Sequence, residues 1–356
     1  MLQQSANLSA RRSDDLLLAL WTKLPKFLAT SVATFLICSM GLSSNGEWIN
    51  IIVHAARQFG YVSRVGDDGV ADVVESLESR LGLRNLGTFL IWNIAVSYLI
   101  YFGLGGFLHW YFYVEQRAKA EEWKCQPKRW LSPELERDEI VLGTCTLFVH
   151  SSISAVLSCY ISNGGYTTIY YGLTDYPLWW TLLQIPILYV YQDYTTYLLH
   201  RLYHTPFMYK NFHKLHHKYK QPTAFSVNAM HPLEAAHIQM HYIVPLFVVP
   251  LHWAIYYGLQ LYIYYHGIID HSGVDFKAHW WQPWQPDAIF HDNHHQYYHV
   301  NFGFNCFIWD KLHGTHRRED RIYNEGIFYG GGKPLSAATP EERIKDYEER
   351  LNERAT

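Results

Sequence analysis

Long stretches without charge constrain the fold of this chain more than any other feature. A helix that crosses a bilayer needs about 20 mostly apolar residues. Runs of that length favour membrane-spanning helices over the buried core helices of a large soluble protein. Window 176–192 is short, but it extends to residue 199 if Asp193 is tolerated within the helix. Aspartate, glutamate, lysine and arginine are absent from 27–46, 85–114, 140–174, 176–192 and 235–269.

Positive charges flank these windows unevenly and predict an orientation. Lysine and arginine gather before residue 27, in 115–139 and in 200–233, and such flanks favour the cytoplasm. Window 235–269 contains Pro245 and Pro250, which disrupt a straight helix, so we expect a bent hairpin that returns to the cytoplasmic side. The predicted fold is all-α: a multi-pass transmembrane bundle of about four spans plus this hairpin, with a cytosolic histidine-rich cap.

Composition excludes several other classes of protein. A net charge of -3 implies no basic surface for nucleic acid, and 17% aromatic residues argue against disorder. The five cysteines form no Cys-x-x-Cys pair, so neither a disulfide framework nor a cysteine-rich zinc site is expected. No cleavable signal peptide is evident. We expect three regions: an N-terminal membrane region (1–139), a central domain (140–315) and a charged soluble tail with a short helix opened by a capping box (316–356).

Histidines carry the strongest chemical signal. Of 21 histidines, 16 fall between His200 and His299. Residues at i, i+3 and i+4 share a helix face, so we expect each cluster to aim its imidazoles at one point. Neutral imidazole is a common ligand of iron, zinc and copper, and eight clustered rings exceed the four ligands of one tetrahedral ion, which points to two metals. The clusters are His200/His204, His213/His216/His217 and His291/His294/His295.

Other functions compatible with these histidines stay open. A membrane zinc hydrolase is one, although the chain has no His-Glu-x-x-His motif. A haem-binding electron carrier is another, because it needs only two axial histidines, such as His109 and His150. A third is a membrane protein whose chemistry has decayed.

The order and spacing of the clusters resemble the fatty acid hydroxylase/sterol desaturase superfamily of membrane di-iron enzymes. The family signature is H-x-x-x-H, H-x-x-H-H and a second H-x-x-H-H, and all three occur here in that order. The resemblance covers roughly residues 140–315 and leaves 1–139 uncovered. Further matching residues are Asp193, His231, Glu234, Asp270, His271, Gly273, Asn301, Gly303, Trp309, Asp310, Gly314 and Thr315.

This resemblance implies a lipid-modifying oxidoreductase. Such an enzyme would use two iron ions and O2 to hydroxylate or desaturate a C–H bond of a sterol, fatty acyl chain or sphingoid base in lipid biosynthesis. It would receive electrons from a b-type cytochrome and its NAD(P)H reductase. Its location would be the endoplasmic reticulum membrane, with the histidine boxes on the cytosolic face.

The resemblance also implies roles for individual residues. We expect Asp193 to accept the second ring N–H of a ligand histidine, and Glu234 to do the same or to bind metal. Asp310 is expected to be a structural ion-pair partner, and His299 is left out of the ligand set. The catalytic candidates are therefore Asp193 and Glu234, and the metal ligands are His200, His204, His213, His216, His217, His231, His271, His291, His294 and His295.

Overall fold

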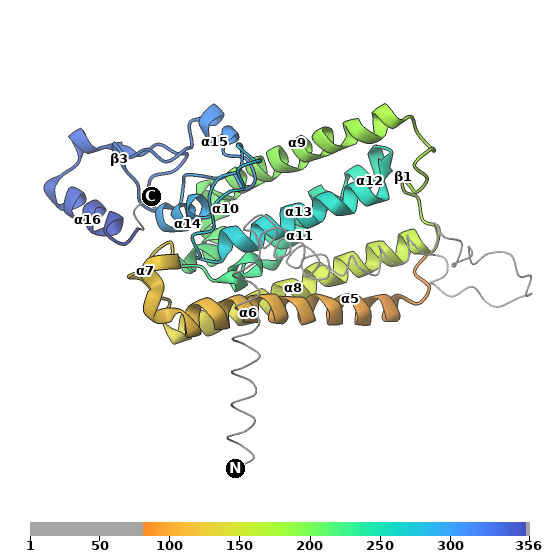
Figure 1. Cartoon of the computed structure of the whole chain (residues 1–356), viewed down its shortest axis with the longest axis horizontal. Coiled ribbons are helices and arrows are strands. Elements are labelled where there is room, and N and C mark those ends of the chain that lie inside the picture. Colours follow the sequence, from red (N-terminus) through yellow and green to blue (C-terminus); the bar gives the residue numbers. More distant parts are fainter. Residues whose placement is uncertain (1–80, 354–356) are drawn as a thin grey trace, which may run out of the picture. The chain divides into compact units, whose positions relative to one another are not determined.

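The computed structural model describes residues 81–353, so the uncharged window 27–46 lies outside the described part of the chain. The described residues are mostly helical (Figure 1). Within them, Leu86–Glu115 and Pro133–Ser162 are long and apolar enough to cross a membrane by length and composition. The number of spans stays a prediction.

The first two long helices pack against each other. The first begins as α5 (Leu86–Ile100) and continues through a π-helical stretch (Tyr101–Gly105), α6 (Gly106–Leu108) and a second π-helical stretch (His109–Glu115). After the 3-10 turn Arg117–Lys119 and α7 (Ala120–Trp123), α8 (Pro133–Ser162) runs back along α5. Ser132 caps α8 through a hydrogen bond to its side chain from the Leu135 N–H, and Pro133 opens the helix. The helix ends at Ser162, so window 140–174 is only partly helical.

The next helices place the histidines. Helix α9 (Leu178–Tyr203) passes through Asp193, as predicted, and stops just before Pro206 opens α10 (Pro206–Asn211). The 3-10 helices His213–Lys218 and Ala224–Asn228 follow. The predicted hairpin then appears as α11 (Pro232–Ile243), α12 (Pro245–Val248) and α13 (Trp253–His271), which runs back beside α9 (Figure 1).

The remaining elements lie beyond the histidine-rich end of the long helices. They are α14 (Ile289–Tyr297), α15 (Ile308–His313), the 3-10 turn Leu335–Ala337 and α16 (Pro340–Arg350). Thr339 and Glu342 form the predicted capping box of α16. Two short sheets complete the described part: β1 (Ile169–Tyr170) pairs in parallel with β2 (Leu251–His252), and β3 (Arg321–Ile322) pairs antiparallel with β4 (Lys333–Pro334).

Close packing joins α8 to the segment that follows the second histidine cluster. A Cβ on Gly143 would lie 2.0 Å from the Tyr101 hydroxyl, so only glycine fits there. One turn earlier, the Glu139 side chain is fully buried, and it accepts hydrogen bonds from the Thr223 N–H, the Thr223 hydroxyl and the Ser226 hydroxyl. Glu139 therefore fixes the 3-10 helix Ala224–Asn228 against α8.

Glu139→Ala tests this attachment. Truncation leaves buried donors without an acceptor, at about 1–3 kcal/mol each, so the free energy of unfolding should fall markedly. Glu134→Ala, an exposed change in the same helix, is the matched control and should cost much less, because a solvated carboxylate near a helix N-terminus contributes little. Denaturation of the detergent-solubilised protein measures both, and equal losses would contradict the assigned role of Glu139.

Candidate metal centre

Four segments bring histidines to one end of the long helices. His200 lies in the last turn of α9, and His204 caps its C-terminus. The second cluster lies on the 3-10 helix His213–Lys218, and His271 ends α13. The third cluster lies on α14. All of these imidazoles are buried.

The imidazoles form two groups, and the ligand atoms within each group lie within 4.8 Å of one another. The expectation that each cluster aims at one point is wrong, because the two H-x-x-H-H clusters are divided between the groups. In the second cluster, His216 lies in a different group from His213 and His217. In the third cluster, His294 lies in a different group from His291 and His295. The first group is His200, His204, His213, His217 and His294; the second is His216, His271, His291 and His295.

Main-chain carbonyls fix the tautomers of two rings in the second group. His216 Nδ1 lies 3.1 Å from the Ala229 carbonyl oxygen, and His271 Nδ1 lies 2.7 Å from that of Gly267. A carbonyl only accepts, so both Nδ1 atoms carry the proton and both Nε2 atoms present a lone pair. Yet these two Nε2 atoms lie 3.3 Å apart. Such an approach is repulsive unless a cation lies between them.

The first group follows the same pattern. His200 Nδ1 donates to the Phe302 carbonyl at 2.8 Å, and His294 Nδ1 donates to the Val300 carbonyl at 2.6 Å. Their Nε2 atoms are therefore also free acceptors. His294 Nε2 is shielded from solvent and has no hydrogen-bond partner among residues 81–353.

His299, excluded by the sequence analysis, holds His204 in place. His299 Nε2 donates to the Glu325 carbonyl at 2.8 Å, so its Nδ1 is an acceptor. That Nδ1 lies 3.0 Å from His204 Nδ1, which must donate and leave Nε2 free. The local histidine density was the only sequence signal. His299 is four residues after His295 but does not continue its helix face, because α14 ends at Tyr297 and Tyr298 turns the chain with φ +69°.

This donor set fits metal ions. Two nitrogens bound to one ion at about 2.1 Å lie about 3.0–3.4 Å apart, depending on the coordination angle. The Nε2 separations within the groups are 3.2 Å for His217–His204, 3.2 Å for His217–His213 and 3.0 Å for His291–His271. Neutral imidazole is a ligand of iron, zinc, copper and nickel, so the donors alone do not select one metal.

Burial keeps the rings unprotonated. It lowers the pKa of His213 to about 3 and that of His216 to about 4, so both are neutral and able to bind metal at neutral pH. Burial also raises the pKa of Glu234 to about 7. One oxygen of Glu234 contacts His213 Nδ1, and the other has no hydrogen-bond partner in the described part of the chain. Glu234 thus orients a ring of the first group.

Asp193 does not contact a ligand histidine. It lies seven residues before His200, about 10.5 Å along the helix, which is too far to reach that ring. Instead it accepts hydrogen bonds from Trp309 Nε1 at 2.6 Å and from Asn305 N and Nδ2 at 3.2 and 3.1 Å. Asp193 therefore anchors the segment that follows the third cluster.

Asp310 supports the same segment by hydrogen bonds rather than an ion pair. Its carboxylate accepts from Phe302 N at 2.8 Å, Gly303 N at 2.7 Å and the Thr315 hydroxyl at 2.6 Å. Since the Phe302 carbonyl holds His200, Asp310 acts on the metal centre through the main chain.

His231 is the one predicted ligand that the structure leaves out of both groups. Its Nδ1 accepts a hydrogen bond from Leu233 N at 3.2 Å and so caps α11, and its ring packs against Phe212. His-Pro-x-Glu therefore begins a helix here, and Glu234 reaches the first group from its first turn.

Comparisons with known proteins agree with this geometry. Residues 185–315 match the fatty acid hydroxylase family, and this range contains every histidine of both groups. The resemblance to the fatty acid hydroxylase/sterol desaturase superfamily is thus confirmed for this part of the chain. The two long apolar helices among residues 81–353 and the sterol desaturase relatives support a membrane protein.

The relatives are named for sterol chemistry. A probable Delta(7)-sterol 5(6)-desaturase of Neurospora crassa is 29% identical over 190 residues, 53% of each chain. A Delta(7)-sterol 5(6)-desaturase of Leptosphaeria maculans is 32% identical over 46% of each chain, and lathosterol oxidase of Mus musculus is 25% identical over 70% of this chain and 81% of the relative. The chain thus spans about half the length of these fungal relatives. No solved structure gives a significant match.

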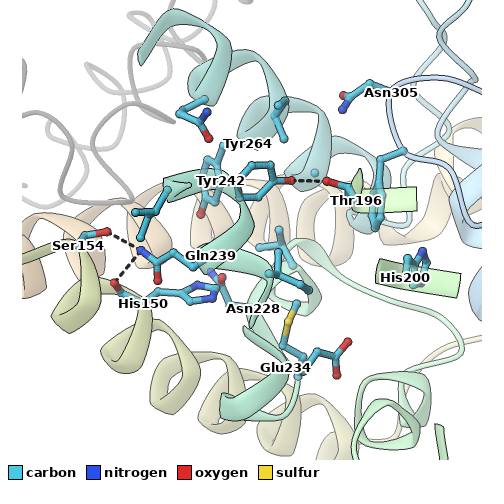
Figure 2. A pocket seen from close by; sticks show the side chains of 18 of the residues that line it. His150, Ser154, Thr196, His200, Asn228, Glu234, Gln239, Tyr242, Tyr264 and Asn305 are labelled. Atoms are coloured by element: carbon cyan, nitrogen blue, oxygen red, sulfur yellow. Dashed lines mark hydrogen bonds between the residues drawn. The ribbon is translucent and has the colours of Figure 1, made fainter. Parts of the chain in front are cut away.

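A cavity extends from these histidines between α8, α9, α11 and α13. His200, His213, His216 and His271 line its end at the metal centre. Figure 2 shows His200 on one side of the pocket, with a group of polar side chains on the other. Much of the remaining lining is aliphatic or aromatic, which suits a lipid; it includes Leu157, Val227, Ile238, Ile243, Leu246, Tyr256, Tyr257 and Ile263.

Metal analysis of variants tests the two groups. We expect wild-type protein purified in detergent to hold about two metal ions per chain. His217→Ala and His216→Ala should each reduce this number, because each removes a ligand from a different group. His231→Asn keeps a good helix cap and should retain the wild-type number. Elemental analysis gives the result, and metal loss in His231→Asn alone would contradict this assignment.

His299→Ala tests the indirect role of His299. The substitution removes the partner of His204 Nδ1, so the ring is no longer held in place and metal affinity should fall about 10- to 100-fold. Competition with a chelator measures it. His279→Ala, a histidine outside both groups, is the control, and an unchanged affinity in His299→Ala would show that His204 needs no such support.

Proposed function

We propose that this protein is an iron-dependent membrane oxidoreductase that introduces a double bond into a sterol, with one iron ion in each histidine group. The observation that carries the proposal is the pair of converging Nε2 groups at the end of an apolar cavity. The sterol names of the relatives support the substrate class, and the superfamily supports iron rather than zinc. Hydroxylation of a lipid is the alternative reaction, because the same superfamily includes fatty acid hydroxylases.

Iron supplies the chemistry that side chains lack, namely the activation of O2 to remove hydrogen from a saturated carbon. The protein positions the reaction. Main-chain carbonyls hold His200, His294, His216 and His271 by Nδ1, so each of these rings presents its Nε2 lone pair as a donor that would hold the metal. Such preorganisation of ligand geometry is what a protein contributes to metal catalysis.

The cavity has two tasks in this proposal. Its aliphatic and aromatic lining holds the lipid body and excludes water from the metal centre. Its opening onto His200, His213, His216 and His271 brings a carbon of the bound lipid toward both groups. Glu234 also lines the cavity, and its second oxygen is available to a proton or to metal.

Redox partners and location belong to the same proposal. The chain has no Rossmann or P-loop fingerprint, so electrons would come from a b-type cytochrome and its NAD(P)H reductase. The histidine groups and the C-terminal segments lie at the same end of the long helices (Figure 1). This arrangement suits a cap on the cytosolic face of the endoplasmic reticulum. The predicted spans and the bent hairpin complete this topology.

Sterol analysis in cells tests the proposal. In a fungal host whose own Delta(7)-sterol 5(6)-desaturase is deleted, we expect the wild-type chain to convert a Delta(7)-sterol to a product with two hydrogens fewer, detected by mass spectrometry. His200→Ala and His271→Ala should abolish conversion, because each breaks one group, while His279→Ala should retain it.

Other outcomes separate the alternatives. Addition of one oxygen would indicate hydroxylation instead. O2-independent cleavage of a lipid ester would favour a zinc hydrolase, and a haem difference spectrum would favour an electron carrier. No change in any lipid, with both irons bound, would contradict the proposal.

A further inference from the structure

The end of the cavity opposite the metal centre carries a group of uncharged polar side chains. Gln239 on α11 donates from Nε2 to the Ser154 hydroxyl at 2.7 Å and to the His150 carbonyl at 3.2 Å, both on α8 (Figure 2). Asn228 lines the cavity beside them and is 2% exposed. Figure 2 shows this group well separated from His200.

The network fixes the orientation of the Gln239 amide. A main-chain carbonyl cannot donate, so the nitrogen must face His150 and the oxygen must point elsewhere. This Oε1 atom is shielded from solvent and has no hydrogen-bond partner among the described residues. A buried acceptor without a donor costs free energy, and functional sites are where such groups are kept.

The charges of the cavity define the chemistry of the ligand that would meet this acceptor. The lining contains no lysine or arginine, and its one carboxylate, Glu234, contacts His213. An ionised carboxylate or phosphate has no donor for Gln239 Oε1 and would find no counter-charge there. An ammonium group would likewise lack an anion beside it. An uncharged hydroxyl supplies the missing donor.

We propose that Gln239, held by Ser154 and the His150 carbonyl, binds the hydroxyl of the sterol substrate and so determines which carbon faces the metal centre. This inference rests on the proposed function. Gln239 lies five residues after Glu234 on α11, about 7.5 Å along the helix. The hydroxyl is therefore held about one and a half turns from the carboxylate that contacts His213.

Binding without turnover tests the proposal. The full chain in lipid nanodiscs is titrated with a Delta(7)-sterol and with its 3-deoxy analogue, which has the same apolar body but no hydroxyl. We expect wild type to prefer the alcohol about 3- to 10-fold, the usual contribution of one hydrogen bond. Gln239→Met keeps the length of the side chain and should lose this preference, and Ser154→Ala should reduce it by releasing the amide.

Ser152→Ala is the matched control. Ser152 lies two residues before Ser154 on α8, outside the cavity lining, and its hydroxyl donates to the Phe148 carbonyl. The Ser152→Ala variant should therefore prefer the alcohol over the 3-deoxy analogue to the same extent as wild type. Comparing ratios cancels the different partitioning of the two sterols into lipid, because every variant meets the same bilayer.

The outcomes separate this inference from the proposed function. An equal alcohol preference in wild type and Gln239→Met would overturn the role of Gln239, even if sterol conversion is intact. Tighter binding of a free fatty acid or a secondary fatty amide than of the sterol would contradict the inference that the ligand of Gln239 is an alcohol. The wild-type chain could also convert no sterol while Gln239→Met loses the preference for the alcohol over its 3-deoxy analogue. That result would support the binding site and contradict the proposed function. In a converting chain, a changed position of the new double bond in Gln239→Met would further support it.

Discussion

The approach of imidazole lone pairs in a buried space is the constraint on which the rest of the site depends. His216 and His271 each donate their one N–H to a main-chain carbonyl, and their Nε2 atoms lie 3.3 Å apart. Neutral rings cannot satisfy one another in that arrangement. A shared cation removes the repulsion, so the packing itself favours metal and makes folding and metal binding interdependent.

The surrounding structure serves to hold this arrangement. Asp310 and Asp193 fix the segment whose Phe302 carbonyl orients His200. At the other side, Gly273 adopts φ +68° where a Cβ would lie 2.3 Å from the Tyr113 hydroxyl. That hydroxyl donates to the carbonyls of Pro222 and Ser272, which joins the chain after the second cluster to the chain after His271. Asp310 and Gly273 thus act through main-chain groups, whereas Asp193 acts mainly through the side chains of Trp309 and Asn305.

The same helices that carry ligands also build the cavity, which links substrate position to metal geometry. Helix α11 bears Glu234 at its first turn and Gln239 one and a half turns later. One rigid element therefore contacts both a histidine of the first group and the polar end of the cavity. A helix is well suited to this role because its rise per residue sets the separation.

The sequence by itself determined the helical class, the break at Pro245 and Pro250, the end of α9 before Pro206, and every member of the two histidine groups. These features depend on local spacing and on residues that are rare beside an apolar helix. Only the tertiary structure decided which ring belongs to which group, that His231 caps α11, that Asp193 holds Trp309, and that His299 supports His204. The cap at His231 is a local contact with the Leu233 N–H, but the ring of a histidine can equally well be a ligand, so spacing alone does not decide its role. The other assignments depend on contacts between segments far apart in the chain, and several of them on main-chain carbonyls, which every residue possesses and no sequence pattern can single out.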